Sequence, residues 1–501
     1  MSVKDAVHDE FEGVYDVCII GSGPVGLTLC AELAELTKTG KRICVLESGG
    51  EKKTPDASSL NDVENDGEVV IKRGSRERIL GGTSTVWSGL SAPLDEIDMS
   101  SRPFLSYTST WPVSYKELAS CYTRAEQYGF PPIDIYSGKG LEAAKKANEL
   151  TIQSAPVVEK IFAEPLSSVN FAKNLEHLFS HPGIDVFCNA TVTRLVSKKD
   201  EGGLSRVTEV QVQSPNKKTR TVSAHVFILA TGGIETSRLL LLSLDTCQQG
   251  LGNEHDQVGR YIMNHPKKSI GILKLARPAR SLPYFFGAKA GDFFAYAGFR
   301  LSDKLQKEKQ VLNSYLRFEP VYPWEEVGAG ISAFIAHIMY KLFKKEPSVT
   351  RIKLRNFMEM EPQASNRITL GKTLDVYGNP LPKVTLNTSD LDRRSLVELH
   401  KVLAEEVAKG SVGTLEGDLE KATPWPVTTE ASHHLGGARM GLNPKSSVVD
   451  SDLRVHSVTN LYTCGGAVFP TSGCANPTYT MVALAIRLAD TLKKQLYTQS
   501  V

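Results

Sequence analysis

The chain has 501 residues, and its 58 Lys and Arg nearly balance its 56 Asp and Glu, giving a formal net charge of +2. That balance argues against a protein that holds nucleic acid through bulk positive charge, and it excludes a strongly acidic disordered chain. With 41% hydrophobic residues, the composition is that of an ordinary globular protein, and the length suggests roughly three domains.

The first residues of the chain and its cysteines indicate in which cellular compartment to expect the protein. Residues 1–13 are polar and lack the apolar region of a signal peptide, and the apolar segment 328–345 is too short to span a bilayer. The eight cysteines form no Cys-x-x-Cys pair, which disfavours a zinc ribbon, and several lie in apolar runs typical of reduced, buried thiols. We expect a cytoplasmic protein without a membrane span, in which residues 328–345 form a core or pocket helix.

The first chemical signal is a glycine-rich turn. Residues 15–20 predict a buried strand, Gly-Ser-Gly-Pro-Val-Gly follows at 21–26, and a helical pattern comes next. In such a unit Gly21 makes the tight turn, Gly23 lets the backbone approach a pyrophosphate, and Gly26 lets the helix pack against the strand. The helix start, at Pro24, then offers N–H groups and a partial positive charge to phosphates.

A second predicted strand, residues 42–47, ends in Glu47. A carboxylate at that place accepts hydrogen bonds from ribose hydroxyls and would repel a 2′-phosphate. Strand, glycine-rich turn, helix, strand and acid together predict a dinucleotide site. The pattern leaves FAD and NAD open, although its position at the start of the chain favours FAD.

Further along, elements of the same kind alternate with others. A strand, a glycine pair and a helix are predicted at 222–243, and a strand, a loop and a long helix at 460–496. The remaining expectations are a loop at 51–77, a helix at 111–127 capped by Ser114, alternating strands at 185–196 and 207–213, short strands within 290–320 and 350–390, and a helix at 389–409. The chain therefore leaves the nucleotide-binding domain and re-enters it at least twice.

The best catalytic candidates lie near the C-terminal end. Oxidation of an alcohol needs a base for the hydroxyl proton, which a neutral imidazole such as His434 could supply, and Asn476 could hold the alcohol oxygen. Each residue also has an ordinary explanation. The paired histidines could be polar surface, and Asn476 before Pro477 could simply cap a helix. No further ligands lie at a spacing that would predict a zinc site or another metal site.

The motifs together resemble the glucose–methanol–choline (GMC) flavin oxidoreductases, with the closest likeness to pyranose oxidase-like and glycoside oxidase-like enzymes. The resemblance rests on segments spread over nearly the whole chain: 21–26 with Glu47, 80–89, 225–243 with 258–266, 433–441 and 469–490. It implies an α/β fold, with a Rossmann-like FAD-binding domain of the glutathione reductase type. It also implies an α+β substrate-binding domain built on an antiparallel sheet.

The resemblance assigns the FAD-binding domain to 1–99, 185–266 and 430–501, and the substrate-binding domain with its connections to 100–184 and 267–429. It implies His434 and Asn476 as the catalytic pair, with His433 shaping the pocket. Further implied cofactor contacts are Gly81, Gly82, Thr83, Ser84, Trp87, Ser88, Val192, Ala230, Gly232, Gly465, Gly466, Ala467, Pro477 and Thr478. Pyranose oxidases bond FAD through a His at the position of Val86, so non-covalent FAD is expected here.

The resemblance implies an FAD-dependent oxidoreductase that acts on an alcohol, with a secondary hydroxyl of a sugar or glycoside as the expected substrate. Oxygen, yielding H₂O₂, or another acceptor would reoxidise the flavin, and an oligomer is possible. Arg355, Glu361, Gln363 and Asn366 could line the substrate pocket, although solvated strand ends are the commoner explanation for such residues. The alternatives are oxidation of a lipophilic alcohol, with 331–345 at the entrance, an NAD-dependent dehydrogenase, and a non-catalytic FAD-binding module.

Overall fold

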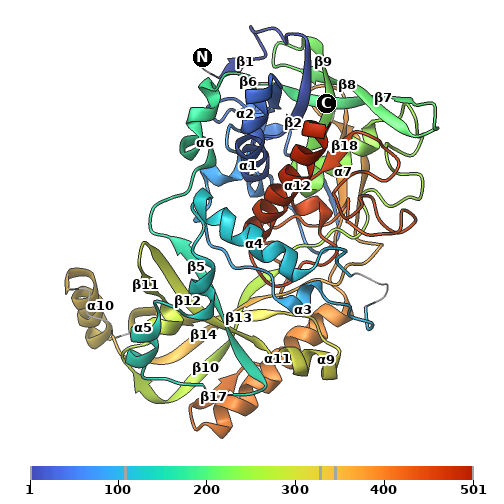
Figure 1. Cartoon of the computed structure of the whole chain (residues 1–501). Helices are drawn as coiled ribbons and strands as arrows, with labels where there is room; N and C mark the ends of the chain where they lie inside the picture. The colour runs from blue at the N-terminus through green and yellow to red at the C-terminus, as the bar shows by residue number, and fades with distance from the viewer. Residues whose placement is uncertain (1–2, 106–109, 153, 326–329, 344–346, 499–501) are drawn as a thin grey trace.

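The computed structural model describes residues 3–105, 110–152, 154–325, 330–343 and 347–498. Figure 1 shows two bodies: one holds both the first and the last elements of the chain, and the other holds its middle. Each is built on its own sheet, and a smaller three-stranded sheet accompanies them. The expected α/β class with parallel and antiparallel sheets is confirmed.

The first body is built on an 8-stranded sheet that is parallel on one side and antiparallel on the other. Its path is β1 (Lys4–Asp5), β6 (Ile184–Cys188), β3 (Ile43–Leu46), β2 (Val14–Ile20), β9 (Thr219–Leu229), β8 (Ser205–Gln213) and β7 (Thr191–Lys199), with β18 (Leu461–Thr463) beside β9. The central strands are apolar and buried on both faces, as parallel strands require.

Helices from distant parts of the chain cover this sheet. α1 (Pro24–Leu33) and α4 (Tyr115–Ala125) each pack against α12 (Thr478–Thr498), which lies with α1 in front of the sheet in Figure 1, and α7 (Gly232–Leu242) follows β9. The predicted start of α4 is confirmed, because Ser114 Oγ accepts the N–H of Glu117 while the Glu117 carboxylate accepts the N–H of Ser114.

The second body is built on a 7-stranded sheet and covered by α11 (Asp390–Lys409). Its strands are β5 (Val157–Pro165), β11 (Ala288–Ala290), β12 (Phe293–Leu301), β13 (Tyr315–Pro320), β14 (Val349–Phe357), β10 (Lys267–Ala279) and β17 (Gly413–Glu416), and every pairing is antiparallel. β15 (Arg367–Leu374), β16 (Pro380–Thr385) and β4 (Glu64–Asp66) form the small sheet. The short strands expected at 290–320 and 350–390 are thus present.

Two expectations differ from the structure. Residues 185–196 do not form one alternating strand, because Asn189 takes a left-handed φ of +56° and divides parallel β6 from antiparallel β7. The segment 51–77 is also less irregular than expected, since it contains α2 (Pro55–Ser59) and β4.

The described part of the apolar segment 328–345 forms α10 (Ile331–Phe343), and for this part the expectation of a core or pocket helix is wrong; 328–329 and 344–345 lie outside the described residues. Ile331 is 80% exposed and Phe334 is 64% exposed, and the helix projects from the second body beyond α5 (Glu142–Ala147) in Figure 1. Among the residues that the structure describes, no helix combines the length and the apolar character that crossing a bilayer requires.

Candidate functional site

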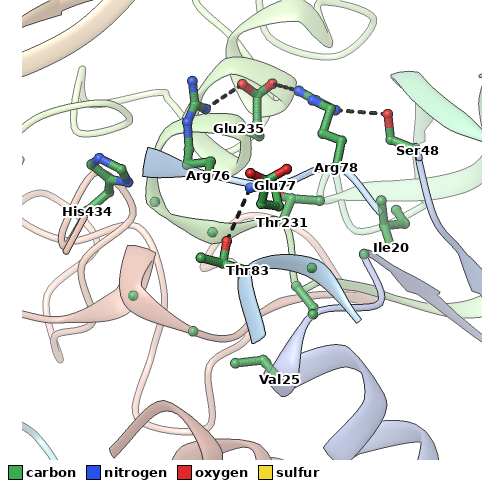
Figure 2. Close-up of a pocket in the computed structure, with 18 of the residues that line it drawn as sticks. Ile20, Val25, Ser48, Arg76, Glu77, Arg78, Thr83, Thr231, Glu235 and His434 are labelled. Carbon is green, nitrogen blue, oxygen red and sulfur yellow. Dashed lines mark hydrogen bonds and ion pairs between the residues drawn. The ribbon is translucent and has the colours of Figure 1, made fainter. Parts of the chain in front are cut away.

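A cavity of about 280 Å³ extends from the glycine-rich turn between β2 and α1 to the loop that carries His433 and His434 (Figure 2). This volume is close to the lower end of the range usual for small-molecule sites, about 300–1,000 Å³. The predicted residues that line it are Gly21, Gly23, Pro24, Glu47, Gly82, Thr83, Ser84, Trp87, Val192, Ala230, Gly232, His433, His434, Gly465, Gly466, Pro477 and Thr478. The separated motifs therefore surround one space.

Other predicted residues lie outside the lining of this cavity. Gly26, Gly81 and Ala467 are buried, Ser88 is exposed to solvent, and Asn476 is in contact with His433, which lines the cavity. Glu361 and Gln363 are bonded to each other near the start of α11, where the Glu361 N–H donates to Asp392. Asn366 donates to the carbonyl of Asn387, so this group is engaged within the fold.

The two glycine-rich segments touch backbone to backbone. A Cβ on Gly82 would lie 2.9 Å from the Cα of Gly23, whereas a Cβ on Gly23 would meet nothing within 4 Å and would project into free space. A Cβ on Gly26 would lie 1.9 Å from the carbonyl oxygen of Gly21, so that glycine is required by the turn itself. A bare backbone facing a long cavity at a helix start fits the pyrophosphate of a dinucleotide.

Glu47 supports this turn as well as lining the cavity. Its Oε2 accepts hydrogen bonds from the backbone N–H and the hydroxyl of Ser22, at 3.0 and 2.6 Å, and its Oε1 accepts the N–H of Gly49. Burial raises the pKa of Glu47, and these hydrogen bonds oppose that shift. The carboxylate therefore fixes the turn, in addition to the predicted contact with a ribose.

A cluster of charged side chains at one end of the cavity was not predicted. Glu235, in the first turn of α7, pairs with Arg76 at 2.8 Å and with Arg78 at 2.9 Å (Figure 2), and Arg78 also donates to Ser48. Burial would raise the pKa of Glu235, but Arg78, Arg238 and Arg76 lower it to about 2. The sequence signal was available in the Arg-x-Arg pair just before the second glycine-rich segment.

The structure separates the two neighbouring histidines. Leu435 forms an antiparallel bridge with Met263, so the chain is extended there and successive side chains point to opposite sides. His433 Nε2 faces Asn476 Nδ2 at 3.4 Å, and its Nδ1 lies 2.8 Å from Nδ1 of His265. Asn476 is therefore paired with His433 rather than with His434.

His434 faces a carboxylate instead. Its Nε2 lies 3.1 Å from Oε2 of Glu430 and 3.5 Å from the hydroxyl of Ser75. Burial lowers the pKa of His434, and Glu430 opposes that shift. Burial alone would raise the pKa of Glu430, but His434 and the N–H of Lys72 hold it below its ordinary value. A neutral imidazole beside a carboxylate must donate from Nε2, so this nitrogen is not a free proton acceptor.

The Nε2 of His433 accepts a hydrogen bond, whereas the Nε2 of His434 donates one. Burial lowers its pKa well below the ordinary value, and the nearby His265, Lys267 and His434 lower it further. Burial likewise lowers the pKa of His265 to about 4. Because an amide N–H only donates, the Nε2 of neutral His433 is the unprotonated nitrogen and accepts a hydrogen bond from Asn476 at this end of the cavity. The residues can thus bind a dinucleotide and hold a proton acceptor near it.

A metal site and an entrance formed by α10 are the two other features to consider. Among the described residues, no group of three or more His, Cys, Asp or Glu side chains is arranged to hold a metal ion. No described residue of α10 contributes to the lining of the cavity, so the entrance role expected for 331–345 has no support in the cavity's walls.

Comparison with known proteins shows what this chain is similar to. Residues 362–485 match the family model described as GMC oxidoreductase. The chain is 30% identical over 306 residues to the fructose dehydrogenase large subunit of Gluconobacter japonicus, covering 58% of this chain and 51% of the relative. It is 23% identical over 561 residues to 2-methyl-1,2-propanediol dehydrogenase of Mycolicibacterium austroafricanum, covering 96% and 95%.

The match to fructose dehydrogenase thus spans about half the length of that subunit. Among solved structures, pyridoxine 4-oxidase from Mesorbium loti is similar, with a TM-score of 0.58 and 17% identity over 96% of this chain and 99% of the other. That likeness concerns the fold. With the matched C-terminal segment and the cavity bounded by both glycine-rich turns, the chain is thus similar to the GMC oxidoreductases in that segment and in its fold.

Proposed function

We propose that the protein is an FAD-dependent oxidoreductase that oxidises a secondary hydroxyl of a sugar or glycoside to a ketone. The observation that carries the proposal is the pair of His433 and Asn476, whose facing nitrogens lie 3.4 Å apart at one end of the dinucleotide cavity. The likeness to a fructose dehydrogenase subunit supports a sugar as the substrate class.

FAD fits the residues that are present. The bare Gly23 and Gly82 backbones suit its pyrophosphate, Glu47 suits a ribose, and Gly465 and Gly466 line the path toward His433. When bound, the flavin would supply the acceptor for the hydride that leaves the alcohol carbon. Val86 cannot form the histidyl bond known from pyranose oxidases, so the cofactor is non-covalent at this position.

The residues of the chain perform the proton chemistry. His433 Nε2 takes the hydroxyl proton of the alcohol, and its lowered pKa keeps it neutral and ready to do so. The side-chain amide of Asn476 donates a hydrogen bond that orients the oxygen. The role given to His434 in the sequence analysis passes to His433, because His434 Nε2 is committed to Glu430. Oxygen or another acceptor completes the cycle.

Anaerobic mixing of the purified holoenzyme with a panel of sugars, glycosides and simple diols tests this proposal. We expect the flavin absorption band to bleach with at least one sugar or glycoside and the oxidised carbon to be a ketone. A colourless protein that binds NAD, or a flavin that no alcohol bleaches, would overturn it. Re-oxidation by air, followed as H₂O₂, distinguishes an oxidase from a dehydrogenase.

A further inference from the structure

The sheet of the second body presents positive charge on the face that looks toward the catalytic loop. In the strand register, Arg317 of β13 stands opposite Arg355 of β14, and Ser269 of β10 stands opposite the same Arg355. Residues directly opposite one another share a face. The alternate residues Leu316 and Leu354 are buried in the core on the other face.

Lys267 extends this charged face to the proposed base. It stands opposite Phe357 in the same register and follows His265, whose Nδ1 lies 2.8 Å from that of His433. The Lys267 charge is close enough to His433 to contribute to its lowered pKa. Burial lowers the pKa of Lys267 itself, with Arg355 as the next cause and Lys72 and Arg317 adding to it, while Glu430 opposes them.

The acids of this region do not balance these cations. Glu319 pairs with Arg317 at 2.8 Å and with Arg355 at 3.4 Å, so one carboxylate serves two guanidinium groups. Glu430 is bonded to His434. Among the described residues, no carboxylate lies within ion-pair distance of the half-buried Lys267 ammonium. A partly desolvated cation without a counter-ion beside a catalytic group is a feature of binding sites for anions.

We propose that the substrate is an alcohol that carries an oxyanion, and that Lys267 and Arg355 bind this group while His433 faces the hydroxyl. This inference rests on the proposed function and names its substrate class. A carboxylate, as in a uronic acid glycoside, and a phosphate, as in a sugar phosphate, share the required chemistry. Arg355 suits either, because its guanidinium can donate two parallel hydrogen bonds.

Paired ligands test the substrate class. Calorimetry on the holoenzyme compares methyl glucuronide with methyl glucoside and glucose 6-phosphate with glucose, and anaerobic mixing compares their rates of flavin reduction. We expect one anionic member to bind about 10–100-fold more tightly than its neutral partner, because charge-assisted hydrogen bonds are about twice as strong as neutral ones. The advantage should shrink as salt is raised. The two pairs distinguish a carboxylate from a phosphate.

Two variants test the residues. Lys267→Gln and Arg355→Gln should each lower the ratio of anionic to neutral affinity about tenfold or more. Lys268→Gln is the matched control, since Lys268 is the next residue on β10, is exposed, and stands opposite Asn356 rather than Phe357. It should leave the ratio unchanged.

Equal affinities for charged and neutral partners, or a ratio that Lys267→Gln and Lys268→Gln change alike, would overturn the inference. If neutral sugars still bleach the flavin in that case, the proposed function stands without it. If anions bind through Lys267 but no alcohol bleaches the flavin, the proposed function fails and the anion site remains.

Discussion

Nδ1 of His265 and Nδ1 of His433 lie 2.8 Å apart, so one of these two buried imidazoles donates a hydrogen bond to the other. Asn476 donates to Nε2 of His433, and this places the ring proton of neutral His433 on Nδ1. His433 is then the donor and His265 the acceptor. The pair fixes the His433 tautomer in which Nε2 carries no proton and can take one when an alcohol displaces the Asn476 N–H, which makes His265 a positioning residue for the proposed reaction.

Replacing His265 with Ala should therefore slow flavin reduction about 10–100-fold, because a buried N–H left unpaired costs roughly 1–3 kcal/mol and the tautomer is no longer fixed. FAD content should be unchanged, and Asn at this position, which keeps an acceptor, should recover part of the rate. Stopped-flow absorbance measures the effect. The control is His400→Gln. His400 is also buried and its pKa is also lowered to about 4, but it is hydrogen-bonded to Asn356 and not to His433. If both variants slow flavin reduction equally, His265 has no positioning role.

The two neighbouring histidines should differ in their importance. His433→Ala should reduce the rate of flavin reduction about 10²–10⁴-fold, the range of general-base catalysis, with FAD still bound. His434→Ala removes a donor to Glu430 and should have a smaller effect on this rate. Rapid mixing with a saturating substrate compares them. A larger loss in the His434 variant would return the catalytic role to that residue.

The pH profile of kcat/KM reports on the same base. His433 is active when neutral, so the rate is lost as pH falls through its pKa, and this pKa lies below the ordinary value of 6.5. The acid limb should therefore lie below pH 6.5. Since the Lys267 charge contributes to the lowering, Lys267→Gln should move the limb upward toward 6.5, whereas Lys268→Gln should leave it in place. An acid limb above 6.5 in the parent enzyme would contradict the assignment.

Alanine substitutions at two glycines of the same turn should affect different properties, FAD affinity at Gly23 and stability at Gly26. Gly23 has an ordinary φ of −66° and room for a Cβ, so Gly23→Ala should fold with an unchanged Tm but bind FAD weakly, because the methyl group enters the space for the pyrophosphate. Gly26→Ala places a Cβ 1.9 Å from the Gly21 carbonyl and should destabilise the fold itself. Thermal unfolding and flavin fluorescence of both apoproteins separate the effects. A Gly23 variant that keeps full FAD affinity would contradict the placement of the pyrophosphate.

Val86 predicts how the flavin is attached. Since its side chain has no nucleophilic atom, acid precipitation should release all of the yellow colour into the supernatant, as FAD. Absorbance of the two fractions measures this. Flavin that stays with the protein pellet would reveal a covalent bond at another residue, because the position of Val86 could not supply it.

Much of the nucleotide-binding part could be predicted, because its signals are local. A strand, Gly21 to Gly26, a helix and Glu47 lie within about one βαβ unit, and the cap at Ser114 needs only the four residues from Ser114 to Glu117. The break at Asn189 was missed because its left-handed φ leaves no mark on the alternating pattern. The exposure of α10 was missed because an apolar segment alone does not say which partner, if any, covers it.

The site was predicted less well, for a geometric reason. Sequence motifs draw attention to both His433 and His434, but the proposed choice between them depends on which side of an extended loop each one faces, and the bridge of Leu435 to Met263 holds the loop extended there. The Arg76–Glu235 pair joins residues 159 positions apart, and Lys267 with Arg355 is brought together only by strand register. Such contacts are properties of the assembled sheet.

The packing of α12 on α1 has a consequence for synthesis on the ribosome. α1 and its strands emerge first, yet α12 and β18, which complete their packing, follow more than 400 residues later. Until then the apolar side chains that α12 will cover remain open, and the intervening antiparallel sheet can form before the domain that flanks it. The cofactor cavity, which Pro477 and Thr478 help to wall, is closed last. Premature termination anywhere before residue 478 should therefore yield a chain that exposes its first-made core and holds no flavin.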